Sequence, residues 1–433
     1  MVMALGLSAC WPAPGQNADR TGHNPFETEI SPATVGSLGE SWSARLDTAD
    51  AGSPVLSAGR VHVTDGNALY GLSAATGARQ WKTALTDFEP GFLFTVGTTF
   101  VDGDRVGVSL VSNVLGGGGT LSLVDAATGA VEQTIEAGHV QSVRSPAAAA
   151  VSTFRGTDIT PVASLVHVDL ATGTTSGGGL LYEGFAPEPQ LTAGRDRIYG
   201  SGPGVLGPFG TIVVPVPGGP PLVFPTFDHL GDGVRSFELE GGRSCVPTFV
   251  GAPPPPDRPW YECGAWATAL DGATSAPPVI GPDESTVYVG TDAGTMYALD
   301  AATGAVRWSA PVGSGIQGPP ALADGVLYVA AGAGELVALD AEGCGAATCA
   351  PRWTAATGGP MVAQPAVAGG VVFTAAQDGT LRAFDAGGCA AEPCEALWSA
   401  ETGSAITGSP AVSGGHLLVG TADGRLISYG VQP

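Results

Sequence analysis

The sequence predicts an all-β fold built from repeated sheets of short strands, and three observations support this. Glycine (67 residues) and proline (35 residues) are abundant although 44% of the 433 residues are hydrophobic, a combination that suits short strands joined by tight turns. The second half of the chain repeats itself about every 45 residues. The length exceeds that of one ordinary domain, so a repeat array accounts for it best.

The clearest copy of the repeat ends at residues 298–308, which read Ala-Leu-Asp-Ala-Ala-Thr-Gly-Ala-Val-Arg-Trp. Alternating apolar residues precede it at 286–290, and a Pro-Pro-Val run stands at 277–279. The same order recurs twice, and its tryptophans lie 45 residues apart, at Trp308, Trp353 and Trp398. A last copy begins near residue 409 and ends without its tryptophan-bearing strand.

Each copy contains strands of four to six residues with period-2 alternation, separated by Asp-Gly, Gly-Gly or Thr-Gly turns, which predicts one four-stranded blade of a β-propeller. In the turn Asp-x-x-Thr-Gly, the polar side chains make local hydrogen bonds, the glycine supplies a positive φ, and the tryptophan packs between blades. The predicted blade-docking residues are Asp300, Thr303, Gly304, Trp308, Asp340, Trp353, Asp385, Trp398 and Trp81.

The first half keeps the same frame in a more degenerate form, with Gln133 where the second unit would carry its tryptophan. A fourth unit, about 188–271, is enlarged by Gly- and Pro-rich inserts. The count gives eight blades in a single propeller over residues 41–433, and seven if the enlarged unit is a separate insertion. We expect residues 41–46 to complete the last blade, so that the two ends of the chain close the ring.

The N-terminus resembles the signal of bacterial lipoproteins. A short apolar run, residues 1–7, leads into Leu7-Ser-Ala-Cys10, which is similar to a lipobox, and this resemblance makes Cys10 the lipidated residue. The run is too short to span a bilayer, and the alternative is a frayed terminus with an incidental thiol. Residues 11–40 are predicted to be a tether and the segment that leads into the propeller. The protein is therefore expected outside the cytoplasm, periplasmic or at the cell surface.

Apart from Cys10, six cysteines remain, an even number that suits an oxidising compartment. Two close pairs take the place of the Thr-Gly turn in successive repeats, and a third pair stands at the equivalent loop of the enlarged unit with a much longer stretch between its cysteines. The predicted disulfides are Cys245–Cys263, Cys344–Cys349 and Cys389–Cys394. A zinc site made from the two close pairs is the alternative, but about 40 residues separate them and no histidine lies nearby in the sequence.

The charge balance argues against nucleic acid as a partner. The chain has 17 basic and 40 acidic residues, a formal net charge of −23, and its one lysine is Lys82. The charged fraction is only 13%, so the acidity is spread thinly along turns and indicates solubility. Contact with a membrane is expected only through the lipid anchor.

The motif at 298–308 resembles the tryptophan-docking motif of PQQ-dependent dehydrogenases and of BamB-type lipoproteins. The resemblance implies the propeller fold and says little about function, because these repeats hold blades together. The dehydrogenases add a calcium ion, a catalytic aspartate, a tryptophan under the quinone and a disulfide of adjacent cysteines, and none is recognisable here. We therefore expect no cofactor, with PQQ and calcium as the alternative.

No motif for nucleophilic, phosphate-binding or zinc-dependent catalysis occurs in the sequence. The six histidines are scattered, and Asp102 with Asp104 is the nearest approach to an acidic cluster. The expected function is a non-catalytic, monomeric scaffold that binds other envelope proteins or an extracellular ligand. A PQQ-dependent oxidoreductase with a diverged site is the alternative, followed by a sensor or hydrolase propeller.

Overall fold

The computed structural model is built of β-strands, with one 3-10 helix, η1 (Val35–Ser37), in the part of the chain that it describes. That part comprises residues 11–85, 94–112, 119–136, 139–144, 149–155, 162–183, 190–194, 197–202, 206–214, 222–229, 233–238, 264–361, 363–390 and 393–432. Within these ranges, no helix has the length and apolar character that crossing a membrane requires.

The strands of the first half form three antiparallel four-stranded sheets, each made from consecutive strands. The first has β3 (Val55–Ser57), β4 (Arg60–Thr64), β5 (Ala68–Ser73) and β6 (Arg79–Ala84). The second has β7 (Phe94–Asp102), β8 (Arg105–Ser112), β9 (Gly119–Asp125) and β10 (Val131–Glu136). The third has β11 (His139–Arg144), β12 (Ala149–Arg155), β13 (Val162–Asp169) and β14 (Thr175–Glu183).

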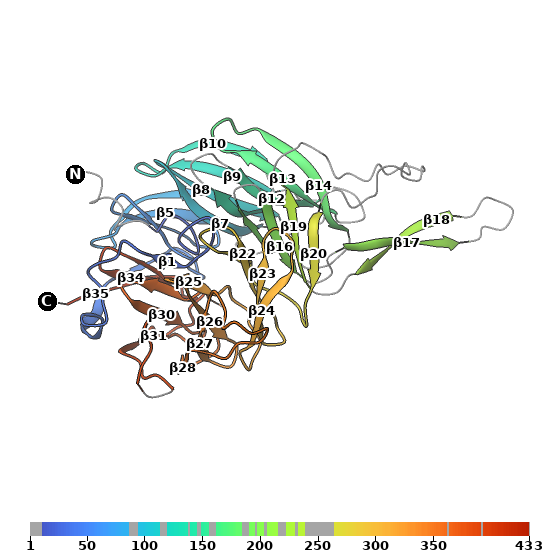
Figure 1. Cartoon of the computed structure of the whole chain (residues 1–433). Coiled ribbons are helices and arrows are strands. Elements are labelled where there is room, and N and C mark those ends of the chain that lie inside the picture. The colour runs from blue at the N-terminus through green and yellow to red at the C-terminus, as the bar shows by residue number, and fades with distance from the viewer. Residues whose placement is uncertain are drawn as a thin grey trace.

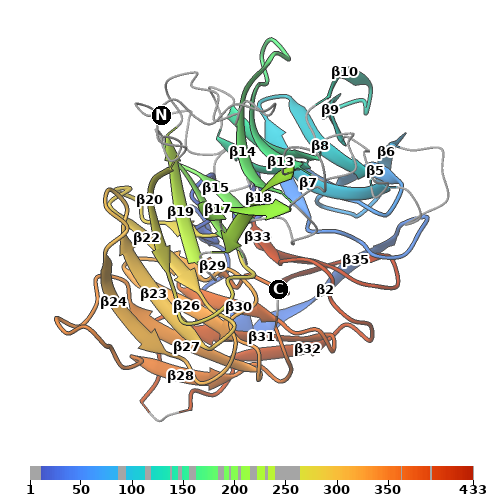
Figure 2. The ribbon, with the colours of Figure 1, turned by 90° about the vertical axis from the view of Figure 1, so that its right-hand side faces the viewer.

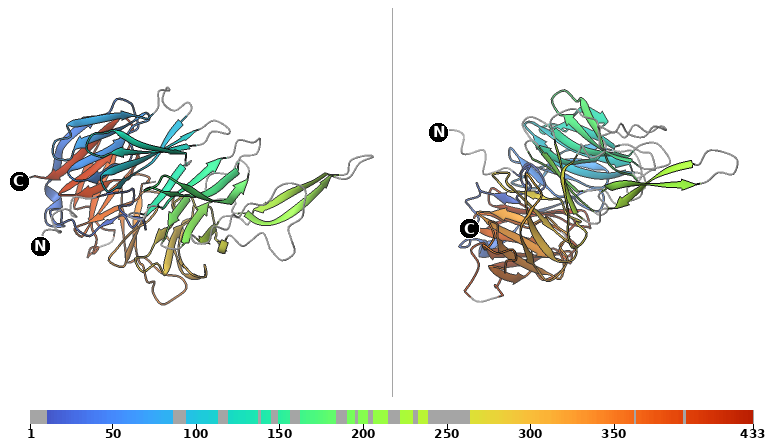
Figure 3. Two further views of the ribbon diagram at one scale, coloured as in Figure 1. Left: turned by 90° about the horizontal axis from the view of Figure 1, so that it is seen from above. Right: turned by 45° about the vertical axis from the view of Figure 1, so that its right-hand side comes forward.

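The enlarged unit forms a fourth such sheet that carries an inserted hairpin. The sheet consists of β15 (Gln190–Ala193), β16 (Arg197–Gly202), β19 (Gly233–Glu238) and β20 (Gly264–Ala269). The hairpin, β17 (Leu206–Val214) with β18 (Leu222–His229), leaves the sheet between its second and third strands. It points away from the rest of the molecule in Figure 1 and Figure 3. The inserts predicted from the Gly- and Pro-rich sequence thus include an additional structural element.

The second half continues the pattern with three more sheets. They consist of β21 (Val279–Ile280), β22 (Thr286–Gly290), β23 (Thr295–Asp300) and β24 (Val306–Pro311); then β25 (Ala321–Ala323), β26 (Val326–Ala331), β27 (Glu335–Asp340) and β28 (Trp353–Ala356); then β29 (Ala366–Ala368), β30 (Val371–Ala375), β31 (Thr380–Asp385) and β32 (Trp398–Glu401). The short strand β1 (His23–Asn24) adds in parallel to β29.

The last sheet joins the two ends of the chain. Its strands β33 (Ala411–Ser413), β34 (His416–Gly420) and β35 (Arg425–Val431) are C-terminal, and its fourth strand is β2 (Leu38–Arg45). The strand β2 pairs antiparallel with β35 from Leu38 opposite Val431 to Arg45 opposite Arg425. In Figure 2 the blue β2 lies beside the red β35. The sequence expectation that an N-terminal strand supplies the missing fourth strand agrees with this pairing.

The sheets pack face to face through their second and third strands. The strands β22 and β26 are buried along their whole length, so both faces of each strand are covered. One core cluster contains residues from the β3–β6 sheet, the β29–β32 sheet and the sheet that contains β2. This arrangement of many antiparallel four-stranded sheets around shared cores is consistent with a β-propeller.

Trp398 links the sheet that joins the two ends of the chain to the sheet before it. Its indole Nε1 donates a hydrogen bond to the carbonyl of Leu38 at 2.9 Å, and its ring meets Tyr429 edge-on with centroids 5.3 Å apart. We expect Trp398→Ala to lower the free energy of unfolding by about 3 kcal/mol, because it removes an aromatic ring from packing. Trp398→Phe keeps most of the ring and removes the donor, so its expected cost is about 1 kcal/mol.

Guanidinium unfolding followed by tryptophan fluorescence and circular dichroism measures both Trp398 variants. Equal costs for the two would show that the hydrogen bond, and not the packing of the ring, dominates this junction.

Candidate functional site

The residues singled out by the repeat form a turn that docks against the preceding sheet. In the turn after β23, the Oδ1 atom of Asp300 accepts hydrogen bonds from the backbone NH groups of Ala302 and Thr303 and from the Thr303 hydroxyl. Hydrogen bonds from Arg307 and Thr303 lower the pKa of the Asp300 carboxyl to about 2. The carboxylate is thus committed to shaping the turn, and this is the role that the sequence predicted for it.

The glycine of this turn receives the tryptophan of the preceding sheet. A Cβ atom on Gly304 would lie 2.4 Å from Cε3 of Trp266, so only glycine leaves room for the indole. The indole Nε1 of Trp266 donates to the carbonyl of Ala301 at 2.9 Å. The same glycine has φ of +73°, so one residue meets a backbone and a packing requirement together.

Other junctions repeat this geometry. Four more indole Nε1 atoms donate to a backbone carbonyl of the following unit: Trp42 to Ala74, Trp81 to Ala126, Trp308 to Ala341, and Trp398 to Leu38. The second unit lacks its tryptophan, and there the Gln133 amide packs against Gly173 of the next turn. A long, flat polar side chain therefore replaces the indole where the repeat is degenerate.

The alanine that begins the motif also has a structural reason, which the sequence alone does not reveal. Ala298 lies in register between Tyr288 on one neighbouring strand and Trp308 on the other, and the two rings approach to 6.2 Å over it. The same arrangement occurs one sheet later with Tyr328, Ala338 and Trp353, and in the first sheet with His62, Gly71 and Trp81. The small central residue lets two large rings make contact across the sheet.

The cysteines at the equivalent turns form disulfides, as their spacing predicts. Cys344 is bonded to Cys349, and Cys389 to Cys394. The sulfur atoms are therefore already bonded in pairs, which is not the arrangement of the zinc alternative. The predicted Cys245–Cys263 pair lies outside the described residues, as does Cys10.

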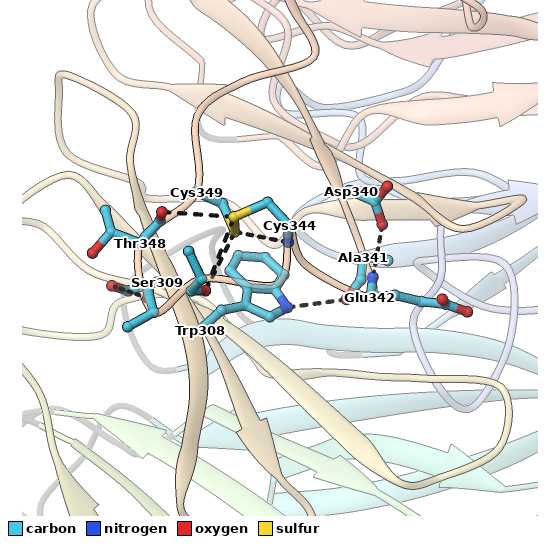
Figure 4. Close-up of a disulfide and its surroundings, with 10 residues drawn as sticks. Trp308, Ser309, Asp340, Ala341, Glu342, Cys344, Thr348 and Cys349 are labelled. Carbon is cyan, nitrogen blue, oxygen red and sulfur yellow. Dashed lines mark hydrogen bonds between the residues drawn. A yellow bond between two sulfur atoms is a disulfide. The ribbon is translucent and has the colours of Figure 1, made fainter.

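Each stapled turn also bonds to the preceding sheet, which the sequence did not predict. Ser309, next to the docking tryptophan, donates its backbone NH to the carbonyl of Ala347 at 2.9 Å, and its own carbonyl accepts the NH of Cys349 at 2.8 Å. Figure 4 shows the Cys344–Cys349 disulfide beside Trp308. The second loop repeats the contact, since the NH of Cys394 donates to the carbonyl of Thr354 at 2.7 Å. The staples therefore hold inter-sheet contacts as well as stiffening their loops.

A second site gathers around the N-terminal residues 11–24, named here the axial segment. Trp11 is 2% exposed, and its backbone exchanges two hydrogen bonds with Leu56 of β3. The stretch 11–19, expected from its composition to be a tether, is therefore packed against the sheets at its start. The free energy gained by burying the Trp11 ring favours packing of this segment, although the residues around it are of turn-forming types.

The axial segment touches the first strand of seven sheets in the described part of the chain. The backbone carbonyls of Pro12, Asp19, Thr21 and Gly22 accept hydrogen bonds from β7, β21, β25 and β29 respectively, in addition to the contact of Trp11 with β3. Arg20 donates to the carbonyl of Gln141 on β11, and Asn24 to that of Val412 on β33. First strands also contact one another, for example β33 with β3 and β3 with β7. The segment thus lies where the inner edges of the sheets converge.

The acidic residues and histidines considered in the sequence analysis make structural contacts where the structure describes them. Asp102 forms an ion pair with Arg105 next to it, which is a structural contact at the end of β7. Of the six histidines, His62 is fully buried against Trp81, and His416 shares a hydrogen bond with Ser428. In the ranges that the structure describes, no group of three His, Cys, Asp or Glu side chains could hold a metal ion.

A comparison with protein families identifies the family to which this chain belongs. The sequence profile described as "Outer membrane protein assembly factor BamB" matches residues 37–173, 264–344 and 343–428, which is more than half of the chain. The protein belongs to this family of PQQ-like repeat propellers. The match stops at residue 173 and resumes at residue 264, at the last strand of the enlarged fourth unit, so the inserts of that unit lie in the unmatched stretch.

Individual proteins resemble this chain over a short stretch of sequence or in their fold alone. "Protein Rv3035" of Mycobacterium tuberculosis is 44% identical over 64 residues, which are 15% of this chain and 16% of that protein. The quinohemoprotein alcohol dehydrogenase of Comamonas testosteroni superposes with a TM-score of 0.63 at 14% identity, covering 98% of this chain and 80% of that one. A europium-containing methanol dehydrogenase gives 0.65 at 13% identity and covers 98% of both chains. These structural matches establish a common fold.

Substitution of two glycines with similar positive φ angles can distinguish the cost of losing the tryptophan contact from the cost of backbone strain. Gly304 and Gly325 have φ of +73° and +76°, but a Cβ on Gly325 would meet nothing within 4 Å in the described chain. We expect Gly304→Ala to cost about 1–3 kcal/mol more unfolding free energy than Gly325→Ala, because only the former collides with Trp266. Guanidinium unfolding measures the free energy of unfolding of both variants. Equal losses would mean that the positive φ alone accounts for the glycine at position 304.

The buried histidine gives a pH prediction. Burial lowers the pKa of His62 to about 4, below its ordinary value of 6.5, so the folded protein favours the neutral ring. The stability that this ring contributes is complete above about pH 6.5 and is lost as the pH falls toward 4, by up to about 3 kcal/mol. His62→Tyr, which introduces the residue found at the matching positions 288 and 328, should flatten this part of the pH dependence. Urea unfolding between pH 4 and 7 measures it, and an unchanged slope would contradict the assignment.

Proposed function

We propose that this chain is a non-catalytic, eight-bladed propeller that acts as a binding scaffold outside the cytoplasm. It is held to the membrane by a lipid on Cys10 and binds other envelope proteins or an extracellular ligand. It works as a monomer without a cofactor. The membership of the BamB family supports a scaffold role, and a propeller of this kind offers its loops as contact surface.

The closed ring is supported by the sheets at the two ends of the chain. The strand β2 completes the sheet of β33, β34 and β35, and first strands of neighbouring sheets contact one another across this junction. Counting each four-stranded sheet as one blade, with β1 as an added strand and the β17–β18 hairpin as an insertion, gives eight. Sheet edges paired in this way keep a scaffold rigid and protected from aggregation.

The observation that carries the non-catalytic proposal is the course of the axial segment. In the described part of the chain this segment hydrogen-bonds to the first strands of seven sheets, so the chain itself occupies inner edges where a propeller would otherwise offer an axial cofactor site. The outer turns and the β17–β18 hairpin remain for binding. Two disulfides in outer turns support a location in an oxidising compartment.

The decisive experiment is a titration of the disulfide-intact protein with PQQ and calcium, followed by absorbance and calorimetry. Dye-linked oxidation of alcohols and aldoses is assayed on the same sample. We expect neither saturable binding nor dye reduction. Binding at a 1:1 ratio with substrate-dependent dye reduction would make the chain an oxidoreductase and overturn the proposal.

The anchor is tested separately in cells. We expect the full-length protein to incorporate a labelled fatty acid and to sediment with membranes, and Cys10→Ser to lose both properties. The control is Cys344→Ser with Cys349→Ser, which removes a disulfide and keeps Cys10. If the Cys10→Ser protein still sediments with membranes, the lipid on Cys10 is not what anchors the protein. Crosslinking on the intact envelope then identifies what the anchored protein binds.

A further inference from the structure

The axial segment places a charged side chain, that of Arg20, where the inner edges of the sheets converge. Arg20 stands in a tight turn whose backbone is held by Gln364, since the Gln364 amide Nε2 donates to the carbonyl of Arg20 at 2.6 Å. The same Nε2 donates to the carbonyl of Pro320 at 2.8 Å, so the turn is tied to two sheets. Arg20 itself has φ of +58°, a conformation that a side chain other than glycine rarely adopts. The fold thus fixes the position of this arginine despite the backbone strain.

The guanidinium of Arg20 is poorly satisfied. Its Nη2 donates to the carbonyl of Gln141, while its Nε is buried without a hydrogen-bond partner. No carboxylate in the described residues forms an ion pair with it, and burial lowers its pKa to about 10. Burying a charge without a counter-ion is among the most costly arrangements in a protein. The residue as a whole has intermediate exposure, so part of its side chain stays accessible to small solutes.

Gln141, the residue whose backbone carbonyl accepts Arg20, carries a second unsatisfied donor. This side chain is only 3% exposed, and its Oε1 accepts the backbone NH of Leu191 at 2.8 Å, which fixes the orientation of the amide. The amide Nε2 is buried and has no hydrogen-bond partner. Because the backbone carbonyl of Gln141 is the acceptor of Arg20, the two unsatisfied donors belong to residues that contact each other. Both groups can only donate, so the missing partner is an acceptor.

We propose that Arg20 and Gln141 form a binding site for a small anion with one negative charge at the axis of the propeller. A halide and the carboxylate group of a small organic acid share the required chemistry, since each accepts hydrogen bonds and neutralises the guanidinium. The site lies inside the ring and takes no part in binding by the outer loops, so it is independent of the proposed scaffold function.

The test follows the thermal midpoint of the full-length, disulfide-intact protein in sodium chloride or sodium acetate, without quinone or calcium. Sodium methanesulfonate keeps the ionic strength constant. We expect the midpoint to rise by about 2 °C or more as the bound anion saturates the site. A response to chloride alone assigns a halide site, and a response to acetate alone assigns a carboxylate site. If neither salt shifts the midpoint, the proposal is overturned.

Arg20→Met removes the charge while keeping a long side chain. We expect this variant to be at least as stable as the natural protein in the reference salt, because an unpaired buried charge is gone, and to show no response to chloride or acetate. The matched control is Arg382→Met, since Arg382 also donates to a backbone carbonyl, that of Ala356 at 2.8 Å, but at an exposed position. The control should keep the full anion response; a response that survives in Arg20→Met would contradict the site.

A second measurement does not depend on the variants folding. Crystals of the natural protein soaked in sodium bromide should show an anomalous scattering peak beside the Arg20 guanidinium if the site takes a halide. For a carboxylate site, bromoacetate replaces bromide in the soak. Peaks confined to the molecular surface in both soaks would overturn the proposal.

Discussion

The contact between a tryptophan and the glycine of the next turn is the interaction on which the rest of the structure depends. A single four-stranded sheet of this size cannot bury both of its faces, so it needs neighbours. Trp266 on Gly304 shows how that need is met, with the indole flat on the glycine and its NH bonded to the carbonyl of Ala301. Each junction fixes the position of the next sheet, and the fold follows from repeating it.

The same junction explains where the sequence is free to vary. The second unit replaces the indole by Gln133, and two later turns replace Thr-Gly by a disulfide-stapled loop that keeps the glycine against the indole, as Gly343 does against Trp308. Variation is greatest between β16 and β19, where the hairpin leaves the sheet without disturbing the strands that pack. Structural demands are concentrated in the inner face of each turn, and the outer loops are left for recognition.

The interactions at the centre of the molecule differ in kind from those at its rim. At the rim, apolar rings and paired cysteines hold neighbouring sheets together. At the axis, short first strands leave backbone donors and acceptors unpaired, and the axial segment satisfies many of them with its own carbonyls. That segment also brings in Arg20, whose charge the described residues leave without a counter-ion. A fold of this kind can therefore be rigid throughout and still hold one polar site in its interior.

The sequence by itself determined the repeat, its strands and turns, the docking role of Asp300 and Trp308, the two short disulfides and the N-terminal strand in the last sheet. These are local patterns, or patterns repeated at a fixed interval, and periodicity and turn chemistry encode them. Only the tertiary structure decided that residues 11–24 are packed against seven sheets and that Arg20 meets Gln141. Those contacts join residues that are distant in the sequence, up to 388 positions apart for Asn24 and Val412. No local pattern marks them, because their energy arises only when the sheets converge.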